Sequence, residues 1–112
     1  MRRLVTDEMM EAALEYLATA SDHIAAARGK RLRAEFKRKR IRARLMLESN
    51  QPSANMREAW AEAHELYAEA CEEEVLAVEA DEHARSERNK VDVIIETYRT
   101  EEATWRKGGD FR

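Results

Sequence analysis

The sequence predicts an all-α protein, built as a long antiparallel helical hairpin of the coiled-coil type. Only three glycines and one proline occur in 112 residues, which is too few for the many turns of a β-sandwich or barrel. Apolar residues recur in register along two long stretches, a pattern that disordered chains lack. The two stretches are separated at Asn50-Gln51-Pro52-Ser53, where the proline disfavours helical geometry in the residue before it.

The first helix is expected over residues 7–48. Thr6 is placed to cap it, and Asp7 and Glu8 suit the positive end of the helix dipole. Gly29 costs about 1 kcal/mol relative to alanine inside a helix, so a break there, giving helices over 7–28 and 31–48, is the alternative. The unbroken helix is favoured because the apolar pattern keeps its phase across Gly29. The apolar face expected to pack in the hairpin consists of Met10, Leu14, Leu17, Ala25, Leu32, Phe36, Ala43 and Met46.

A turn over 49–53 and a second helix over 54–106 complete the hairpin. Ser53 is placed to cap the second helix, and Arg106 and Lys107 form a cationic last turn before a flexible tail over 107–112. A strict seven-residue repeat indicates a left-handed supercoil, and its alanines permit a close approach of the helices. The repeat runs through Ala63, Ala70, Ala77, Ala84, Val91, Tyr98 and Trp105, flanked by Leu66, Ala80 and Ile94.

Residues 1–112 are therefore expected to form a single elongated domain with one narrow buried stripe. Isolated two-helix structures of this kind are marginally stable. Ile41, Leu45, Val75 and Val78 are also expected to lie off the contact between the two helices. We therefore expect a homodimer that forms a four-helix bundle around a two-fold axis.

The net charge of −3 conceals two oppositely charged segments. Residues 28–44 contain ten Lys or Arg and one acid, whereas residues 58–82 contain ten acids and no Lys or Arg. In one interpretation the basic segment binds the phosphate backbone of DNA or RNA, and Phe36, which is expected to face the core, does not stack on bases. The cations predicted to contact nucleic acid are Lys30, Arg31, Arg33, Lys37, Arg38, Lys39, Arg40, Arg42 and Arg44.

In the other interpretation the basic segment pairs with the acidic one. The hairpin is then expected to place Glu62 to Glu74 opposite roughly Arg44 to Lys30, with interhelical ion pairs setting the register. The two interpretations are compatible, because pairing consumes only the flanks of each helix. Lys30, Lys37 and Arg44 are expected to stay available on the far side.

Two further functions use other surfaces. A column of carboxylates resembles the spacing of phosphates, so the acidic helix is an alternative surface for antagonising a host defence enzyme or a nucleic-acid enzyme. The residues of this partner-binding alternative are Glu62, Glu65, Glu69, Glu73 and Trp105. The second alternative is a structural coiled-coil adaptor, for which neither charged surface contacts a specific ligand.

The sequence offers no catalytic constellation. It contains neither a nucleophile elbow nor a glycine-rich phosphate loop. The residue three positions before each of His23, His64 and His83 is alanine, so the Glu-x-x-His pairs of di-iron bundles are missing. We therefore expect no enzyme activity, no metal and no cofactor. Cys71 is the single cysteine and no long apolar run occurs, which predicts a cytoplasmic protein without a membrane partner.

Three segments carry a resemblance. They are Leu45-Met46-Leu47-Glu48-Ser49 after the basic run, Met56-Arg57-Glu58-Ala59-Trp60-Ala61, and the closing stretch from Tyr98 to Arg106. Together they are similar to small helical proteins encoded by tailed bacteriophages and prophages, over about residues 10–107. The resemblance implies a non-enzymatic accessory role in the host cytoplasm, alongside recombination or replication proteins.

Overall fold

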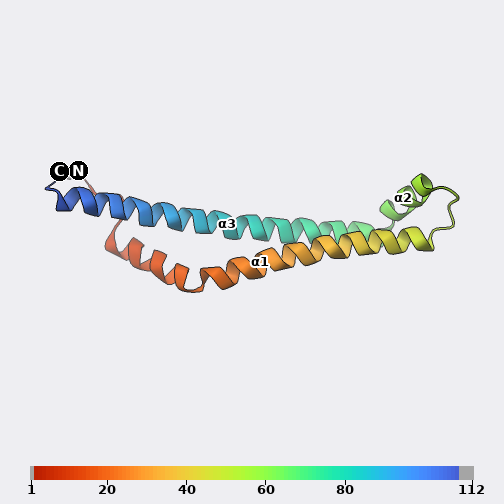
Figure 1. Cartoon of the computed structure of the whole chain (residues 1–112), viewed down its shortest axis with the longest axis horizontal. Helices are drawn as coiled ribbons and strands as arrows, with labels where there is room; N and C mark the ends of the chain where they lie inside the picture. Colours follow the sequence, from red (N-terminus) through yellow and green to blue (C-terminus); the bar gives the residue numbers. More distant parts are fainter. Residues whose placement is uncertain (1, 109–112) are drawn as a thin grey trace. The chain divides into compact units, whose positions relative to one another are not determined.

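The computed structural model describes residues 2–108, and three helices account for nearly all of them (Figure 1). They are α1 (Asp7–Glu48), α2 (Ala54–Glu62) and α3 (Glu65–Arg106). The helices α1 and α3 run antiparallel, so the predicted all-α hairpin is confirmed. Gly29 lies inside an unbroken α1, which confirms the continuous helix over the alternative with a break. No helix in residues 2–108 is long and apolar enough to cross a membrane.

Contacts divide the hairpin into two compact units. The terminal unit, described over residues 2–24 and 83–108, pairs the first part of α1 with the second part of α3. The central unit, Ala25–Glu82, contains the rest of α1, all of α2 and the first part of α3. Each unit is held together by its own buried residues and its own polar contacts.

Both predicted helix caps are confirmed. The Thr6 hydroxyl oxygen accepts a hydrogen bond from the amide of Met9 at 3.1 Å, at the start of α1. The Ser53 hydroxyl oxygen accepts one from the amide of Met56 at 3.2 Å, at the start of α2. Each hydroxyl satisfies an amide that has no carbonyl partner in the first turn of its helix.

The segment expected to form one helix over 54–106 is instead two helices. The first ends at Glu62, and Nδ1 of His64 accepts a hydrogen bond from the amide of Leu66 at 3.1 Å, which caps the start of α3. A side chain that bonds to a nearby amide competes with the continuation of a helix. The predicted seven-residue row is buried from Ala70 to Val91, whereas its expected first and last members, Ala63 and Trp105, are exposed.

Alanines are most of the buried hydrophobic residues of α1 and α3. In the central unit Ala34, Ala70 and Ala77 are no more than 6% exposed. In the terminal unit Ala13, Ala20, Ala84 and Val91 have the same role. The α1 alanines at 13, 20 and 34 are spaced by multiples of seven, so α1 supplies a row that matches the row of α3.

The prediction of which face of α1 packs in the hairpin is wrong. Leu14, Leu32 and Phe36 are 52%, 46% and 69% exposed, and Ala25 and Ala43 are exposed as well. The alanine face packs against α3 instead, because small side chains let the two backbones approach closely. The close approach also brings long charged side chains on both flanks within reach of each other.

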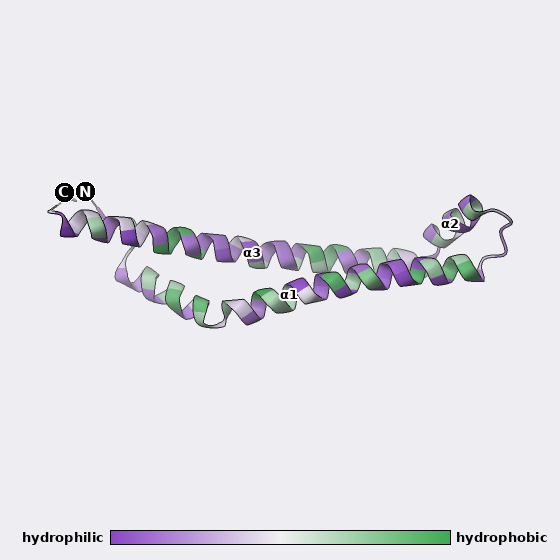
Figure 2. Ribbon diagram, viewed as in Figure 1, coloured by the Kyte–Doolittle hydropathy of each residue, from purple (hydrophilic) through white to green (hydrophobic). Residues whose placement is uncertain are grey.

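Two other expected positions differ. Leu45, expected off the contact, is 2% exposed, and Leu66, expected on its flank, is 51% exposed. Leu45 lies eleven residues after Ala34, a spacing that returns to the same side of a helix. Hydrophobic residues are consequently spread along both long helices (Figure 2).

Candidate functional site

Arg31 forms the most buried ion pair of the central unit. Its Nη1 lies 3.0 Å from Oδ2 of Asp81, which is fully buried, and 3.1 Å from Oε1 of Glu82. The hydrogen bond to Asp81, followed by that to Glu82, raises the pKa of Arg31 above its ordinary value. Buried carboxylates are stable only when paired, so Arg31 is committed to the hairpin and is a poor phosphate ligand.

Three more of the predicted nucleic-acid-binding cations pair with acids of α2 or α3. Lys37 Nζ lies 2.8 Å from Glu73 Oε2, and Arg38 Nε lies 2.9 Å from Glu74 Oε1. Arg42 bridges two acids of α2, at 2.8 Å from Glu58 and 3.1 Å from Glu62. The prediction that the basic and acidic segments pair is therefore correct, whereas Lys37, expected to stay available, is engaged.

The register of the pairing differs from the expected one. Glu74 meets Arg38 rather than a residue near Lys30. The physical reason is the break at His64. The nine residues of α2 do not extend α3, so the α3 positions opposite the end of α1 carry higher residue numbers than a continuous helix would give.

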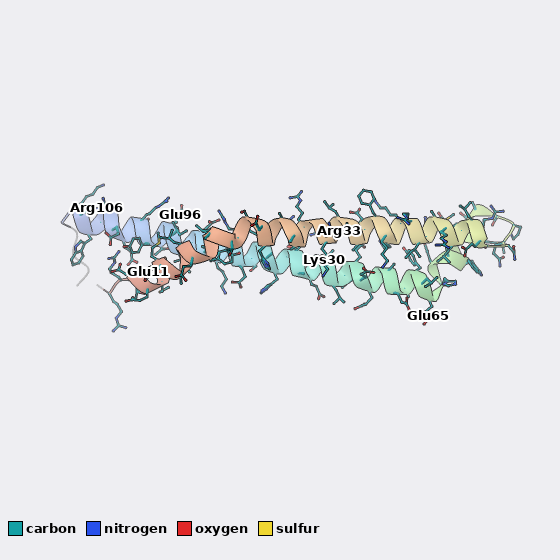
Figure 3. All side chains as sticks on the ribbon, turned by 90° about the horizontal axis from the view of Figure 1, so that it is seen from below. Glu11, Lys30, Arg33, Glu65, Glu96 and Arg106 are labelled. Atoms are coloured by element: carbon teal, nitrogen blue, oxygen red, sulfur yellow. The ribbon has the colours of Figure 1, made fainter. Side chains whose placement is uncertain are left out.

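The remaining predicted cations form a second group on α1. Among residues 2–108, Lys39 and Arg44 pair only along their own helix, with Glu35 at 3.1 Å and Glu48 at 3.3 Å. Of the predicted cations, Lys30, Arg33 and Arg40 form no ion pair with any residue in 2–108, and neither does Arg28 at the start of the basic segment. All four are exposed, and Lys30 and Arg33 are labelled in Figure 3. These are the basic side chains that the hairpin leaves for another ligand.

Two adjoining hollows lie among these basic residues. One, of about 470 Å³, is lined by Arg33, Phe36, Lys37, Arg40 and Ile41. The next, of about 310 Å³, shares Arg40 and Ile41 and adds Ala43, Arg44 and Leu47. We refer to these eight residues as the basic–apolar face of α1. Phe36 is 69% and Leu47 86% exposed, so arginines and large apolar side chains alternate on one open surface.

The acidic surface of α2 and α3 is partly used within the chain. Of the alternative partner-binding residues, Glu62 and Glu73 pair with Arg42 and Lys37, whereas Glu65 and Glu69 make no ion pair to the described part of the chain. Leu76, which follows them on α3, is 57% exposed. These glutamates belong to the central unit.

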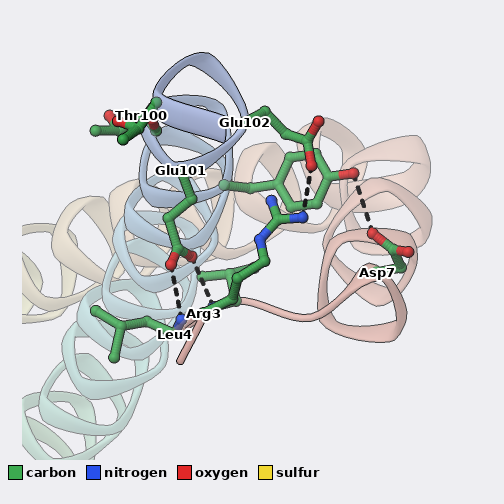
Figure 4. A network of polar contacts seen from close by, with 9 residues as sticks. Arg3, Leu4, Asp7, Thr100, Glu101 and Glu102 are labelled. Atoms are coloured by element: carbon green, nitrogen blue, oxygen red, sulfur yellow. Dashed lines mark hydrogen bonds and ion pairs between the residues drawn. The ribbon is translucent and has the colours of Figure 1, made fainter. Parts of the chain in front are cut away.

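The fifth alternative residue, Trp105, is 58% exposed and belongs to the terminal unit. Near it, a polar network ties the start of the chain to α3 (Figure 4). Glu101 is 8% exposed, and its two carboxylate oxygens accept hydrogen bonds from the amides of Leu4 at 2.8 Å and Val5 at 2.9 Å. The amide of Leu4 is the main cause that lowers the pKa of Glu101, and the amide of Val5 adds to it.

Arg3 and Tyr98 extend the same network. Arg3 Nη1 lies 2.6 Å from Glu102 Oε1, and its guanidinium carbon lies 5.1 Å from the centre of the Tyr98 ring, within the range of a cation–π contact. The Tyr98 hydroxyl donates to Asp7 Oδ1 at 3.1 Å. Sequence reasoning missed this network, because Glu101 and Glu102 look like any other exposed pair of acids in a charged helix.

In residues 2–108, no cluster of three or more His, Cys, Asp or Glu side chains is arranged to hold a metal ion. Comparisons of this chain with protein-family models, curated proteins and solved structures find no match. The resemblance to phage-encoded accessory proteins therefore stays a prediction.

Proposed function

We propose that this chain is a non-catalytic, coiled-coil-type adaptor that binds a protein partner through the basic–apolar face of α1. The observation that carries the proposal is an inversion of side-chain size. Alanines fill the contact between the helices, whereas Phe36 and Leu47 stand 69% and 86% exposed. Exposed apolar groups beside arginines are typical of the anchors of protein interfaces.

The charge balance of the central unit favours a protein partner over a polyanion. Residues 25–82 contain 11 Lys or Arg and 12 Asp or Glu, so the unit is almost neutral. The acidic part of α3 packs directly against the basic part of α1. Their charges are therefore closer together than the Debye length, which is about 8 Å at physiological salt. Opposite fields at such short range largely cancel for a long, uniformly charged ligand.

Nucleic-acid binding is the second candidate, and a specific observation favours it. Arg33 and Arg40 have no ion-pair partner in residues 2–108, and the exposed Phe36 stands between them on α1. Cations around an exposed aromatic ring suit single-stranded nucleic acid, in which bases are free to stack. This candidate agrees with the accessory role, beside recombination or replication proteins, that the phage resemblance implies.

Photo-crosslinking separates the two candidates. A benzoylphenylalanine placed at Phe36 reacts with whatever covers this residue in the cell. We expect an adduct that protease destroys and nuclease leaves intact. The matched control has the same group at Glu35, the neighbouring position on another side of α1, and should give little adduct.

An adduct that nuclease removes would establish the second candidate in place of the first. Equal crosslinking at Phe36 and Glu35 would show that neither ligand recognises the basic–apolar face. Binding of DNA that weakens steeply with salt is the independent check on the nucleic-acid candidate.

A further inference from the structure

We propose that the partner on the basic–apolar face is a second copy of this chain. The α3 helix of that copy packs there with the side that carries Glu69 and Leu76. The inference rests on the proposed function and names its partner. It requires that one chain carries both a basic surface and a complementary acidic surface. It also requires that the two surfaces lie at the same level along the hairpin. Both requirements follow from contacts in the single chain.

One side of the central unit carries both surfaces. Arg33, Lys37, Arg40 and Arg44 are spaced by four, three and four residues, so they follow one side of α1. The bond from Lys37 to Glu73 shows that this side of α1 borders the side of α3 that carries Glu73. The same spacing rule places two further α3 residues on that side, namely Glu69, four positions before Glu73, and Leu76, three positions after it.

The heights match between copies as well as within one. The bonds Lys37–Glu73 and Arg38–Glu74 fix the relative heights of the antiparallel helices to within about two residues, and each step forward along α1 corresponds to one step back along α3. Arg40 is thus level with the stretch from Ala70 to Glu72, within one helical turn of Glu69. A two-fold axis parallel to the helices adds no shift along them, so Arg40 of one copy comes within one helical turn of Glu69 of the other. Neither Arg40 nor Glu69 has an ion pair to residues 2–108 of its own chain.

Apolar side chains fall at the heights of the hollows. By the same count Leu76 of the second copy is level with the stretch from Ala34 to Phe36, at the hollow lined by Arg33 and Phe36. Leu66 of the second copy is level with the stretch from Arg44 to Met46, at the hollow lined by Arg44 and Leu47. Leu66 and Leu76 are 51% and 57% exposed in the single chain, so burying them in these hollows removes apolar surface from water on both sides.

A second copy fits this surface better than an unrelated protein for two reasons. The basic side of α1 and the acidic side of α3 occur on one chain, so a two-fold axis satisfies both at once and closes the assembly as a dimer. The resulting four-helix bundle has each α1 beside two α3 helices, its own and that of the second copy, and each α3 beside two α1 helices. In the central unit, the basic part of each α1 therefore meets the acidic part of α3 in its own copy and in the second copy.

Disulfide crosslinking tests the contact at residue level. Arg40→Cys and Glu69→Cys are made separately in a Cys71→Ala background, then mixed, unfolded together, refolded and oxidised. We expect a covalent dimer that joins one chain of each kind, because positions 40 and 69 meet only between copies of different kinds. The control mixture combines Glu69→Cys with Glu35→Cys, on another side of α1, and should give at least tenfold less product. Equal yields from the two mixtures would overturn the proposal.

Charge reversal tests the same pair without a crosslink. We expect the unaltered chain to sediment at twice its 13.0 kDa mass, with the dimer Kd raised tenfold or more by Arg40→Glu or Glu69→Arg. The double variant restores the charges in both copies of the contact and should recover most of the affinity. Arg28→Glu is the matched control, since Arg28 is five residues before Arg33 and so lies on another side of α1.

The failure of this inference differs from a failure of the proposed function. A chain that sediments at 13.0 kDa over roughly a hundredfold range of concentration would refute the dimer. If the crosslinker at Phe36 still captures a protein of a different mass, the adaptor function stands with another partner. If the crosslinker captures no protein at all, the adaptor function falls with the dimer.

Discussion

Arg31 reaches across the hairpin to Asp81, with 3.0 Å between Nη1 and Oδ2. The carboxylate is fully buried, whereas about a third of the arginine side chain is exposed. The pair therefore joins a charge that depends on its partner to one that water also stabilises. Its value lies in keeping the buried carboxylate satisfied rather than in the Coulomb attraction alone.

Removing only the arginine should therefore cost more than removing the whole pair. We expect Arg31→Met to lower the Tm by several degrees, because Asp81 loses a partner that helps to offset its desolvation. The double variant Arg31→Met/Asp81→Leu should recover part of that loss, since no buried charge is left behind. Thermal unfolding followed by circular dichroism measures both. A double variant that is less stable than either single variant would contradict this account.

The terminal unit should show a distinct dependence on pH. Glu101 has a pKa below its ordinary value because its carboxylate accepts the amides of Leu4 and Val5. A carboxyl group whose pKa is lowered by folding stabilises the fold fully above its unfolded-state pKa, about 4.3 for glutamate. That contribution is lost as the pH falls through the lower folded-state value.

Amide hydrogen exchange at Leu4 and Val5 reports this contact directly. We expect their protection to fall in acid, and Glu101→Gln to reduce it at neutral pH, because a neutral amide is a weaker acceptor than a carboxylate. Glu96→Gln, on an exposed residue of α3, is the control and should leave both amides unchanged. Protection that is the same in the Glu101→Gln variant and the unaltered chain would show that the carboxylate does not hold this segment.

The alanine row should not tolerate large side chains. Ala77 is 5% exposed between α1 and α3, so Ala77→Leu has to push the helices apart and should cost about 1–3 kcal/mol in the free energy of unfolding. Ala68→Leu, on an exposed position of α3, adds the same side chain outside the contact and should cost little. Urea denaturation of the two variants gives the comparison. Equal losses would mean that helix propensity, rather than the width of the contact, sets the effect.

The helices themselves were predictable, because capping residues and heptad spacing act over a few residues. Thr6, Ser53 and the row from Ala70 to Val91 are where the sequence places them. The packing face of α1 was not, because α1 has two apolar faces and the prediction took the one with larger side chains. Size favours burial in general, but an alanine row already present on α3 selects another alanine row.

The sequence prediction missed the apolar part of the candidate site because of the same choice of face. Assigning Phe36 to the core concealed the fact that it lies among arginines on an open surface. The signal that would have revealed it was available: Ala13, Ala20, Ala27 and Ala34 repeat every seven residues, as the α3 row does. The register of the ion pairs could not be predicted from the sequence, because it depends on the short break at His64, which no proline or glycine marks.

That break gives the last prediction. Nδ1 of His64 accepts the amide of Leu66, the bond that starts α3 after the turn at residues 63–64. We expect His64→Ala to cost about 1 kcal/mol, as the loss of a helix cap does, and to speed hydrogen exchange at Leu66. His64→Asn supplies a side-chain oxygen suited to the same position and should retain most of the stability and protection. If His64→Asn is as destabilised as His64→Ala, the imidazole contributes through its contact with Trp60, whose ring centre lies 5.4 Å away, rather than as a cap.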